Sequence, residues 1–316
     1  MATPALRGRF VWHELLTTDT AAGIRFYTKI TSWKTEPYPG MPGYTLLNGT
    51  RGPVGGVMGV PDPSIPPNWL SYIGTADVDA TANQATALGG KVITPPTTIP
   101  VGRFAILQDP QGATFAIYTP NLLEEKDPKP QLGEFSWHEL VTTDPVAAFS
   151  FYQQLFGWEK TRAMPMPEIG VYQIYGVPGL ELGGIYKKPA DYPAPPNWLP
   201  YILIADSKKA VTQTTQLGGK IMAGPMEVPG GDLIAMGMDP QGAAFAVHSR
   251  KAEMAAKAGA AAAKKAAPKK AVKKATPKKA AAKKAAPKKK AAARKAAPKK
   301  KAVAKKATKK ATKKRR

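Results

Sequence analysis

The sequence predicts an α+β protein of two tandem domains, each built from two βαβββ modules, followed by a disordered basic tail. Three observations lead to this prediction. The first 250 residues contain one long series of motifs written twice, each copy alternates strand-like and helix-like segments, and the remaining residues are almost entirely Ala, Lys and Pro. A repeat this long is a whole domain, because solenoid units repeat about every 20–50 residues.

The two copies are aligned by motifs that recur in the same order. The matched pairs are GRFVWHELLTTD with GEFSWHELVTTD, PPNWLSYI with PPNWLPYI, LGGK with LGGK, and DPQGATFAIY with DPQGAAFAVH. The offset between the copies grows from 125 to 130 residues along the chain, as expected when short loop insertions accumulate after a duplication. We therefore divide the chain into domain 1 (1–123), a charged linker that contains proline (124–132), domain 2 (133–250) and the tail (251–316).

Each copy begins with a strand and a helix. Residues 10–16 alternate in the manner of a half-buried strand. Asp19 and Asp144 stand where a helix N-cap is expected, and Pro145 suits the first helical position. The apolar faces of the two helices contain Ala22, Phe26 and Ile30 in the first copy and Ala148, Phe151 and Leu155 in the second, with Tyr27 and Tyr152 expected to serve packing.

The rest of each copy predicts short strands, a second helix and a final strand. In the first copy, strands over 44–47 and 54–60 are followed by a helix over 77–88. Gly89-Gly90 suits a left-handed C-cap for that helix. The DPQG tetrapeptide has the residues that a type I turn favours, and it leads into a strand over 114–118. The same series in the second copy brings the number of predicted modules to four.

Almost all of the positive charge is confined to the tail. Residues 251–316 hold 28 of the 46 basic side chains and one of the 22 acidic ones. The first 250 residues therefore carry a net charge of −3 within a total of +24. The absence of cysteine excludes disulfides, thiolate metal sites and cysteine nucleophiles. The N-terminal residues contain no apolar run as long as a signal peptide or a membrane span, so we expect a cytoplasmic protein.

The repeated motifs resemble the vicinal oxygen chelate superfamily, which includes glyoxalase I, bleomycin- and fosfomycin-resistance proteins and extradiol dioxygenases. The shared features are a first strand that ends in Asp, FY seven residues later, GW or SW before the next strand, and a DPxG turn before the last strand. The resemblance covers about residues 8–120 and 133–249. FxWHELxTTD, PPNWxxYI and DPQGAxFA are similar to the tandem glyoxalase-like proteins of bacteria. The resemblance implies a cupped sheet around a cavity in each domain.

In metal-binding members of this superfamily, His or Glu ligands lie on the inner face of the cup. The equivalent positions here carry Trp12 and Trp137, Leu70 and Leu199, and Ala116 and Ala246. None of these side chains can donate a lone pair, whereas divalent ions need several N or O donors. The resemblance therefore implies cavities without a metal cofactor, and it weakens the expectation of Lewis-acid chemistry. A divalent metal held by His138 and His248 is the alternative.

The WHE tripeptide in the first strand of each copy supplies the candidate site. Strand alternation places Trp12 and Glu14 on one face and His13 on the other. A tryptophan wall with one carboxylate suits an aromatic or cationic small molecule. The carboxylate of Glu14, or of Glu139 in the second copy, becomes a general base if burial raises its pKa. The competing interpretation is structural, with the tryptophan in the core and the glutamate accepting hydrogen bonds from neighbouring strands.

Further candidate ligand-binding residues lie on strands beside this site. With Trp12 and Trp137 they are Tyr72, Tyr201, Tyr118 and His248. His248 lies on the last strand of domain 2, where domain 1 has Tyr118. His13 and His138 become ligands only if the register of the first strand slips by one residue, which exchanges the faces of the strand. A structural role for these two histidines is the favoured interpretation.

The tail is predicted to be disordered on its own and to bind DNA. It has no aromatic residue with which to build a core, and its composition resembles the tails of linker histones and of lysine-rich bacterial nucleoid proteins. Ten phosphate contacts would give a log–log salt slope of about −9 on duplex DNA, and no base-reading element is visible. The candidate DNA-binding residues are Lys269, Lys270, Lys278, Lys279, Lys288, Lys289, Lys299, Lys300, Arg315 and Arg316.

Three function classes follow from these features. The leading hypothesis is a tandem glyoxalase-like protein that binds a small molecule in metal-free cavities and is tethered to DNA at the nucleoid. The alternatives are a lyase or hydroxylase that uses Glu14 and Glu139, and a structural protein of the nucleoid. RNA, polyphosphate and anionic lipids compete as partners of the tail, although it lacks the apolar face of a membrane helix. A monomer with internally paired domains and a homodimer are both compatible with the sequence.

Overall fold

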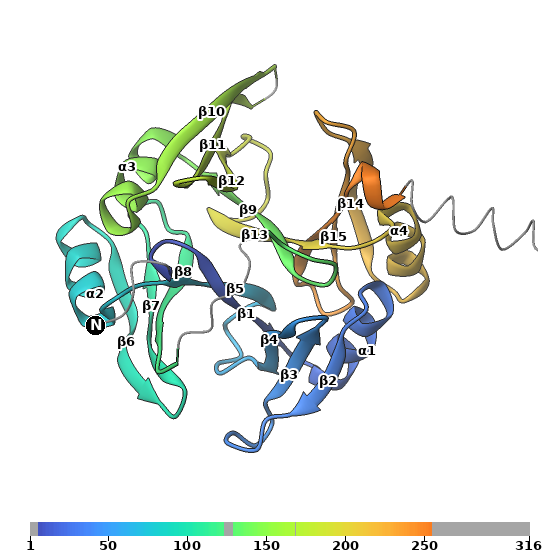
Figure 1. Ribbon diagram of the computed structural model, residues 1–316, viewed down its shortest axis with the longest axis horizontal. Helices are drawn as coiled ribbons and strands as arrows, with labels where there is room; N and C mark the ends of the chain where they lie inside the picture. Colours follow the sequence, from blue (N-terminus) through green and yellow to red (C-terminus); the bar gives the residue numbers. More distant parts are fainter. Residues whose placement is uncertain (1–5, 123–128, 168, 255–316) are drawn as a thin grey trace, which may run out of the picture. The chain divides into compact units, whose positions relative to one another are not determined.

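The computed structural model describes residues 6–122, 129–167 and 169–254. The elements of domain 1 are β1 (Phe10–Thr17), α1 (Thr20–Ile30), β2 (Lys34–Pro37), β3 (Thr45–Gly49), β4 (Gly52–Gly59), β5 (Asn68–Gly74), α2 (Val78–Ala87), β6 (Lys91–Ile99), β7 (Gly102–Gln108) and β8 (Thr114–Pro120). Those of domain 2 are β9 (Phe135–Thr142), α3 (Pro145–Phe156), β10 (Glu159–Met166), β11 (Gly170–Val177), β12 (Leu180–Lys187), β13 (Asn197–Leu203), α4 (Ser207–Gln216), β14 (Lys220–Glu227), β15 (Leu233–Met238) and β16 (Ala244–Ser249). Figure 1 shows their arrangement.

Each domain forms one eight-stranded, cupped sheet from two βαβββ modules. The strand order is β2-β3-β4-β1-β5-β8-β7-β6 in domain 1, and domain 2 repeats it as β10-β11-β12-β9-β13-β16-β15-β14. The antiparallel pair of β1 and β5 joins the two modules of domain 1, and within each module the first and last strands run parallel. The predicted α+β class and the modular architecture are therefore confirmed.

Local sequence signals define the ends of the helices as predicted. The Asp19 side chain accepts a hydrogen bond from the main-chain N of Ala22, and Asp144 caps α3 in front of Pro145. The capped amides have no partner inside the helix, which is why a carboxylate is favoured there. Helix α2 ends before Gly89, whose φ of +87° is the left-handed conformation predicted for its C-cap.

The two faces of each sheet carry different side chains. We call the face that carries Trp12 and Trp137 the inner face, and the face covered by helices the outer face. Glu14 lies on the inner face with Trp12, whereas His13 points to the outer face. The predicted alternation of the WHE tripeptide is therefore confirmed, and the one-residue slip that would place His13 on the inner face is wrong.

The hydrophobic cores are shared between the domains. One core joins the second module of domain 1, including Leu107 and Phe115, to the first module of domain 2, including Phe151 and Trp158. The other joins the first module of domain 1 to the second module of domain 2. In Figure 1, α1 accordingly lies beside α4 and α2 beside α3. Each core therefore depends on both copies of the repeat.

Two buried tyrosines tie the copies together. The hydroxyl of Tyr27 in α1 donates to Asp239 of domain 2 at 3.2 Å, and that of Tyr152 in α3 donates to Asp109 of domain 1 at 3.0 Å. Both aspartates open the DPQG turns. The indole N–H of Trp69 donates to the Tyr27 hydroxyl at 2.9 Å, and Trp198 repeats this contact with Tyr152 at 3.0 Å. The tyrosines do serve packing, as predicted, but they do so across the domain boundary.

The predicted tail lies almost entirely outside the described residues, which end at Met254. Its candidate DNA-binding residues, from Lys269 onward, therefore remain predictions. Within the described ranges, no helix is long and apolar enough to cross a membrane.

Candidate functional site

The inner face of each sheet carries an aromatic cluster around one buried carboxylate. In domain 1, Leu70, Tyr72 and Ala116 are buried, with Trp12, Phe104, Ile106 and Tyr118 packed half-buried against them. In domain 2, Leu199, Tyr201 and Ala246 are packed with Trp137, Ile234 and Met236. Glu14 is 9% exposed and Glu139 is 7% exposed. The clusters come from strands of both modules, so closing the sheet assembles them.

Glu139 accepts hydrogen bonds on both of its oxygens. The Tyr172 hydroxyl donates to Oε1 at 2.6 Å, and the Tyr201 hydroxyl donates to Oε2 at 2.7 Å. The indole N–H of Trp137 donates in turn to the Tyr172 hydroxyl at 2.8 Å. This chain of donors orients the carboxylate and one edge of the tryptophan.

Domain 1 repeats this arrangement. The Tyr72 hydroxyl donates to Oε2 of Glu14 at 2.9 Å, and the Trp12 indole donates to the Tyr44 hydroxyl at 3.0 Å. Tyr44 also favours the charged form of Glu14, since its hydroxyl lowers the pKa of that carboxyl against the effect of burial. The array of one glutamate, two tyrosines and one tryptophan is therefore built twice.

The repeated Gly-Gly dipeptide makes room for this array. A Cβ at Gly56 would lie 2.0 Å from the Tyr44 hydroxyl oxygen, and a Cβ at Gly184 would lie 2.0 Å from Cζ of Tyr172. The tyrosine rings thus rest directly on the strands β4 and β12, beside the glutamates. Any larger residue at these glycines would displace the rings.

Burial changes the acidity of the two carboxyl groups. Loss of hydration raises the pKa of Glu14 and of Glu139 above the ordinary value of 4.5, because the charged form is the one that burial disfavours. The tyrosine hydroxyls oppose this shift, since they donate to the carboxylate. The pKa of the tyrosines shifts in the same direction: burial and the neighbouring glutamate raise the pKa of Tyr72 and Tyr201 well above 10.

Two of the predicted ligand-binding residues lie at the margin of the clusters. The Tyr118 ring packs edge-on against Tyr72, with ring centroids 6.4 Å apart, and its hydroxyl donates to the main-chain O of Val101 at 2.7 Å. His248 has its Nδ1 3.0 Å from the Ser136 hydroxyl and its Nε2 2.9 Å from Asp232. Neither side chain hydrogen-bonds to the glutamate of its domain.

The positions that correspond to the superfamily's metal ligands do meet on the inner face. Trp12, Leu70 and Ala116 belong to one cluster, and Trp137, Leu199 and Ala246 to the other. These side chains offer no donor to a cation. Within the described parts of the chain, no group of three or more His, Asp and Glu residues is arranged to hold a metal ion. The residues present therefore do not fit the divalent ion of the superfamily.

The two histidines of the WHE tripeptides lie between the sheets, away from both inner faces. Nε2 of His13 and Nε2 of His138 are 2.7 Å apart, and both rings are buried. His138 has a second contact to the main-chain O of Leu182, at 3.4 Å. His138 and His248, the suggested metal pair, share no hydrogen-bond partner.

Tyr44 and Tyr172 are site residues that the repeated motifs do not contain. Both lie in variable segments between the motifs, so no motif singled them out. They are nevertheless equivalent in the repeat, because the offset of 128 that aligns Gly56 with Gly184 also aligns Tyr44 with Tyr172. Extending the alignment outward from the glycines would have identified them.

Comparisons with known proteins agree with this architecture. The profile of the Glyoxalase/Bleomycin resistance protein/Dioxygenase superfamily matches residues 9–117. A Mycobacterium tuberculosis (strain CDC 1551 / Oshkosh) protein named "Putative glyoxylase CFP32" is 31% identical over 245 residues, covering 75% of this chain and 92% of that protein. The anthracycline biosynthesis protein DnrV of Streptomyces peucetius is 28% identical over 277 residues, covering 80% of this chain and 98% of DnrV.

Solved structures share the fold. The 2,2',3-trihydroxybiphenyl 1,2-dioxygenase of Sphingomonas wittichii strain RW1 is similar with a TM-score of 0.55 at 12% identity, over 77% of this chain and 90% of that one. The Mn(II)-bound glyoxalase of Novosphingobium aromaticivorans has a TM-score of 0.52 at 14% identity, over 77% and 82%. At such identities the likeness concerns the fold alone. The family assignment comes from the 31% identical relative and from the matching profile. The chain belongs to the glyoxalase/bleomycin resistance protein/dioxygenase superfamily.

Proposed function

We propose that the inner faces bind a planar, aromatic small molecule without the help of a metal ion. The observation that carries this proposal is the repeated array of a half-buried tryptophan beside a buried, tyrosine-bound glutamate. The tryptophan offers a surface for stacking. The glutamate offers a hydrogen-bond acceptor, or a negative charge for a cationic group. A planar molecule with a hydroxyl or amino substituent meets both requirements.

The relatives support the choice of ligand class. DnrV is named for anthracycline biosynthesis, and the match covers 80% of the length of the present chain. Anthracyclines are polycyclic aromatic compounds with hydroxyl groups on the ring system. Stacking on Trp12 or Trp137 and a hydroxyl directed at the neighbouring glutamate would therefore satisfy the chemistry of the inner face.

Fluorescence titration of an anthracycline with the full chain tests this function. Following the emission of the ligand avoids a signal that depends on the protein's own tryptophans. Leu substitutions at Trp12 and Trp137 together should weaken binding by about tenfold or more, because an aromatic contact is worth roughly 0.5–1.5 kcal/mol beyond its buried area. The carboxamide variant Glu181→Gln is a suitable control, since Glu181 pairs with Arg162 on the surface. Equal affinity of the wild type and the double tryptophan variant would refute the proposal.

An enzymatic role is the second candidate, because burial raises the pKa of Glu14 and Glu139 toward the range of a general base. Replacing both by Gln keeps the size of the side chain and removes the basic oxygen. In domain 2 it also turns one of the two tyrosine-bound oxygens of Glu139 into an NH2 group, which cannot accept. If the inner faces only bind, the double variant should keep the part of its affinity for the anthracycline that stacking on Trp12 and Trp137 supplies, and it should lose the part that the carboxylate supplies. If they also catalyse, conversion of the bound compound, followed by mass spectrometry, should stop while binding persists.

The tail is proposed to hold the protein on DNA or on another polyanion. What supports this is its composition, with 28 basic side chains in residues 251–316. The dissociation constant of the full chain on duplex DNA should rise steeply with salt, with a log–log slope of about −9 if ten phosphates are contacted. Scrambling the DNA sequence should leave the affinity unchanged. A salt-independent constant would contradict the proposal, and preferential competition by RNA or polyphosphate would identify a different polyanion.

A further inference from the structure

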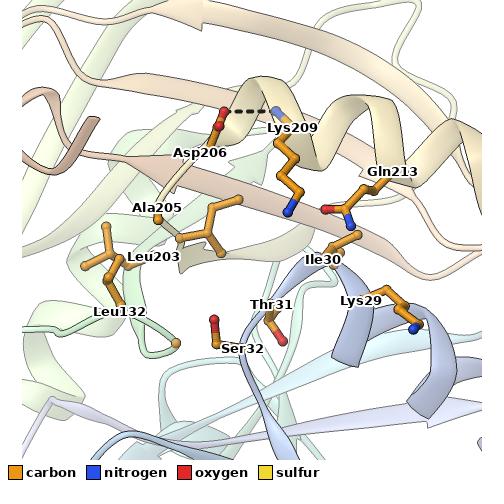
Figure 2. A pocket seen from close by; sticks show the side chains of 12 residues that line it. Lys29, Ile30, Thr31, Ser32, Leu132, Leu203, Ala205, Asp206, Lys209 and Gln213 are labelled. Carbon is orange, nitrogen blue, oxygen red and sulfur yellow. Dashed lines mark hydrogen bonds between the residues drawn. The ribbon is translucent and has the colours of Figure 1, made fainter. Parts of the chain in front are cut away.

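A small cavity lies where the end of α1 meets the start of α4, outside both inner-face clusters. Its volume is about 210 Å³, and its walls come from the last residues of α1 and the segment leading into α4 (Figure 2). The first belongs to domain 1 and the second to domain 2, so the cavity exists only because the domains pair. Pockets for drug-sized ligands measure about 300–1,000 Å³, so this one suits a smaller molecule.

At the equivalent place in the other half of the repeat, two exposed side chains of the protein itself reach the end of the helix. There, Nη2 of Arg7 donates to the main-chain O of Leu155 at 3.1 Å, and Nε2 of Gln84 donates to that of Gln154 at 3.0 Å. Both carbonyls belong to the last turn of α3, where the helix itself supplies no donor. A guanidinium and an amide thus complete this helix end.

The arginine has no counterpart at the cavity. At the repeat offset of 125, Arg7 corresponds to Leu132, which lines the cavity and has no hydrogen-bond donor in its side chain. The carbonyl of Ile30 corresponds to the one that accepts from Arg7 in the other half. The carbonyl of Lys29 corresponds to the one that accepts from Gln84, and Gln213, the counterpart of Gln84, also lines the cavity. The end of α1 therefore faces a space in which a guanidinium would find the counterpart of the acceptor that Arg7 has at the end of α3.

The opposite wall carries a positive charge that the other half lacks. Lys209 corresponds to Ala80 in domain 1. Figure 2 shows the side chain of Lys209 extending into the cavity from α4, while the Ser32 hydroxyl points in from the side of α1. The Asp206 carboxylate accepts a hydrogen bond from the main-chain N of Lys209 at 2.9 Å and so caps α4. The Lys209 ammonium is thus placed to attract an anionic group of a ligand.

We propose that this cavity binds free arginine or a closely related guanidino acid. The guanidinium takes the place of Arg7 in the other half and donates to the main-chain O of Ile30. The carboxylate pairs with Lys209. A ligand with only one of these groups satisfies only one wall, so both charges contribute to affinity. The site is separate from the inner faces, and ligand bound there contacts both domains.

Isothermal titration of the full chain with three related compounds tests the inference. L-Arginine carries both groups, agmatine lacks the carboxylate, and citrulline has an uncharged group in place of the guanidinium. Arginine should bind with one equivalent per chain. Agmatine and citrulline should each bind about tenfold more weakly or worse, because a hydrogen bond to a charged group contributes roughly 1.5–3 kcal/mol. Absence of heat with arginine, or equal affinities for all three compounds, would overturn the proposal.

Two substitutions locate the binding at this cavity. Leu132→Arg should fill the cavity with the protein's own guanidinium and abolish arginine binding, with the melting temperature unchanged or raised. Lys209→Ala should weaken binding by about tenfold. Lys208→Ala is its matched control, because Lys208 is the preceding residue of α4 and does not line the cavity. Unaltered arginine binding by a folded Leu132→Arg variant would place the ligand elsewhere and overturn the assignment.

Discussion

At the scale of single residues, the contact between His13 and His138 is the most constrained. Their Nε2 atoms are 2.7 Å apart, so one ring must donate and the other must accept. Phe135 stacks on His13 and Phe10 stacks on His138, each with ring centroids 3.6 Å apart. The two copies of the WHE tripeptide therefore hold different tautomers, although their sequences agree.

Acid should weaken the protein through this pair. Burial lowers the pKa of His13, and it lowers the pKa of His138 to about 3. The unfolded chain takes up these protons near pH 6.5, whereas the folded chain does not. The contribution of the two neutral, buried histidines to the free energy of unfolding is therefore fully present above pH 6.5. Below that pH the free energy of unfolding should fall by up to about 1.4 kcal/mol per histidine for each pH unit. Urea unfolding between pH 7.5 and 5 measures this slope.

A double variant with Leu at both histidines isolates their share of the pH dependence. Glu14 and Glu139 act in the opposite direction, because a raised folded pKa stabilises the protein as the pH falls toward 4.5. Only the histidine contribution disappears in the double variant. An unchanged slope between pH 7.5 and 5 would show that the pair does not titrate as the geometry implies.

The tyrosine hydroxyls between the domains should contribute measurably to stability. Tyr152→Phe removes a donor from Asp109 and an acceptor from Trp198, both of which are buried. A buried polar group without a partner costs about 1–3 kcal/mol, and the melting temperature should drop accordingly. Tyr118→Phe is the control, because its hydroxyl contacts only a main-chain carbonyl near the surface. A smaller loss in Tyr152→Phe than in the control would contradict this interpretation.

At the scale of elements, β4 and β12 determine where the inner-face tyrosines lie. Each strand contains a Gly-Gly pair that packs on its neighbours without side chains. Gly55 and Gly183 approach the main-chain O of His13 and His138, and the next glycine supports a tyrosine ring. The same short motif therefore brings the strands close together and positions a ring against the glutamate.

Gly56→Ala should move Tyr44 and damage the inner face of domain 1. The new Cβ would lie 2.0 Å from the Tyr44 hydroxyl oxygen, so the ring must leave its contact with Trp12. We expect a loss of about 1–3 kcal/mol in unfolding free energy, as for other overpacked sites, and weaker anthracycline binding by one of the two faces. Gly59→Ala in the same strand is the matched control, because nothing lies within 4 Å of its Cβ position. Equal behaviour of the two variants would show that Tyr44 is not held by Gly56.

At the scale of the whole molecule, the two domains depend on each other because each hydrophobic core is formed by modules of both domains. Each core takes one module from either copy, and the Tyr–Asp contacts cross in both directions. The described part of the chain is accordingly expected to unfold as one cooperative unit, although its sequence consists of two repeats.

A substitution in one domain should therefore destabilise both. Phe115 is fully buried and packs edge-on against Tyr152 of the other domain, with ring centroids 5.2 Å apart. Phe115→Ala should cost about 3–5 kcal/mol, and differential scanning calorimetry should show a single peak displaced to lower temperature. Leu122→Ala, at an 84% exposed position, should leave the peak in place. Two separate peaks in the Phe115→Ala variant would show that the domains unfold independently.

Much of the site could be predicted from the first strand alone. The period of two in WHE placed Trp12 and Glu14 together, because successive side chains on a strand point to opposite faces. The partners of the glutamates could not be predicted in the same way. Tyr172 and Tyr201 lie on other strands, and only the pairing of those strands brings their hydroxyls to Glu139.

The sequence by itself determined the repeat, the four modules, the helix caps and the uneven charge, because these depend on composition and on local spacing. The tertiary structure decided whether the helix of each copy packs against its own copy or against the other one. The tyrosine of FY and the aspartate of DPQG lie 82 residues apart in the first copy and 87 in the second, and their contact runs from one copy to the other. The two copies carry the same motifs, so the sequence does not distinguish a contact within a copy from one between copies. The packing of Phe26 on Phe245 and of Phe151 on Phe115 makes that choice, because it removes the apolar faces of the helices from water.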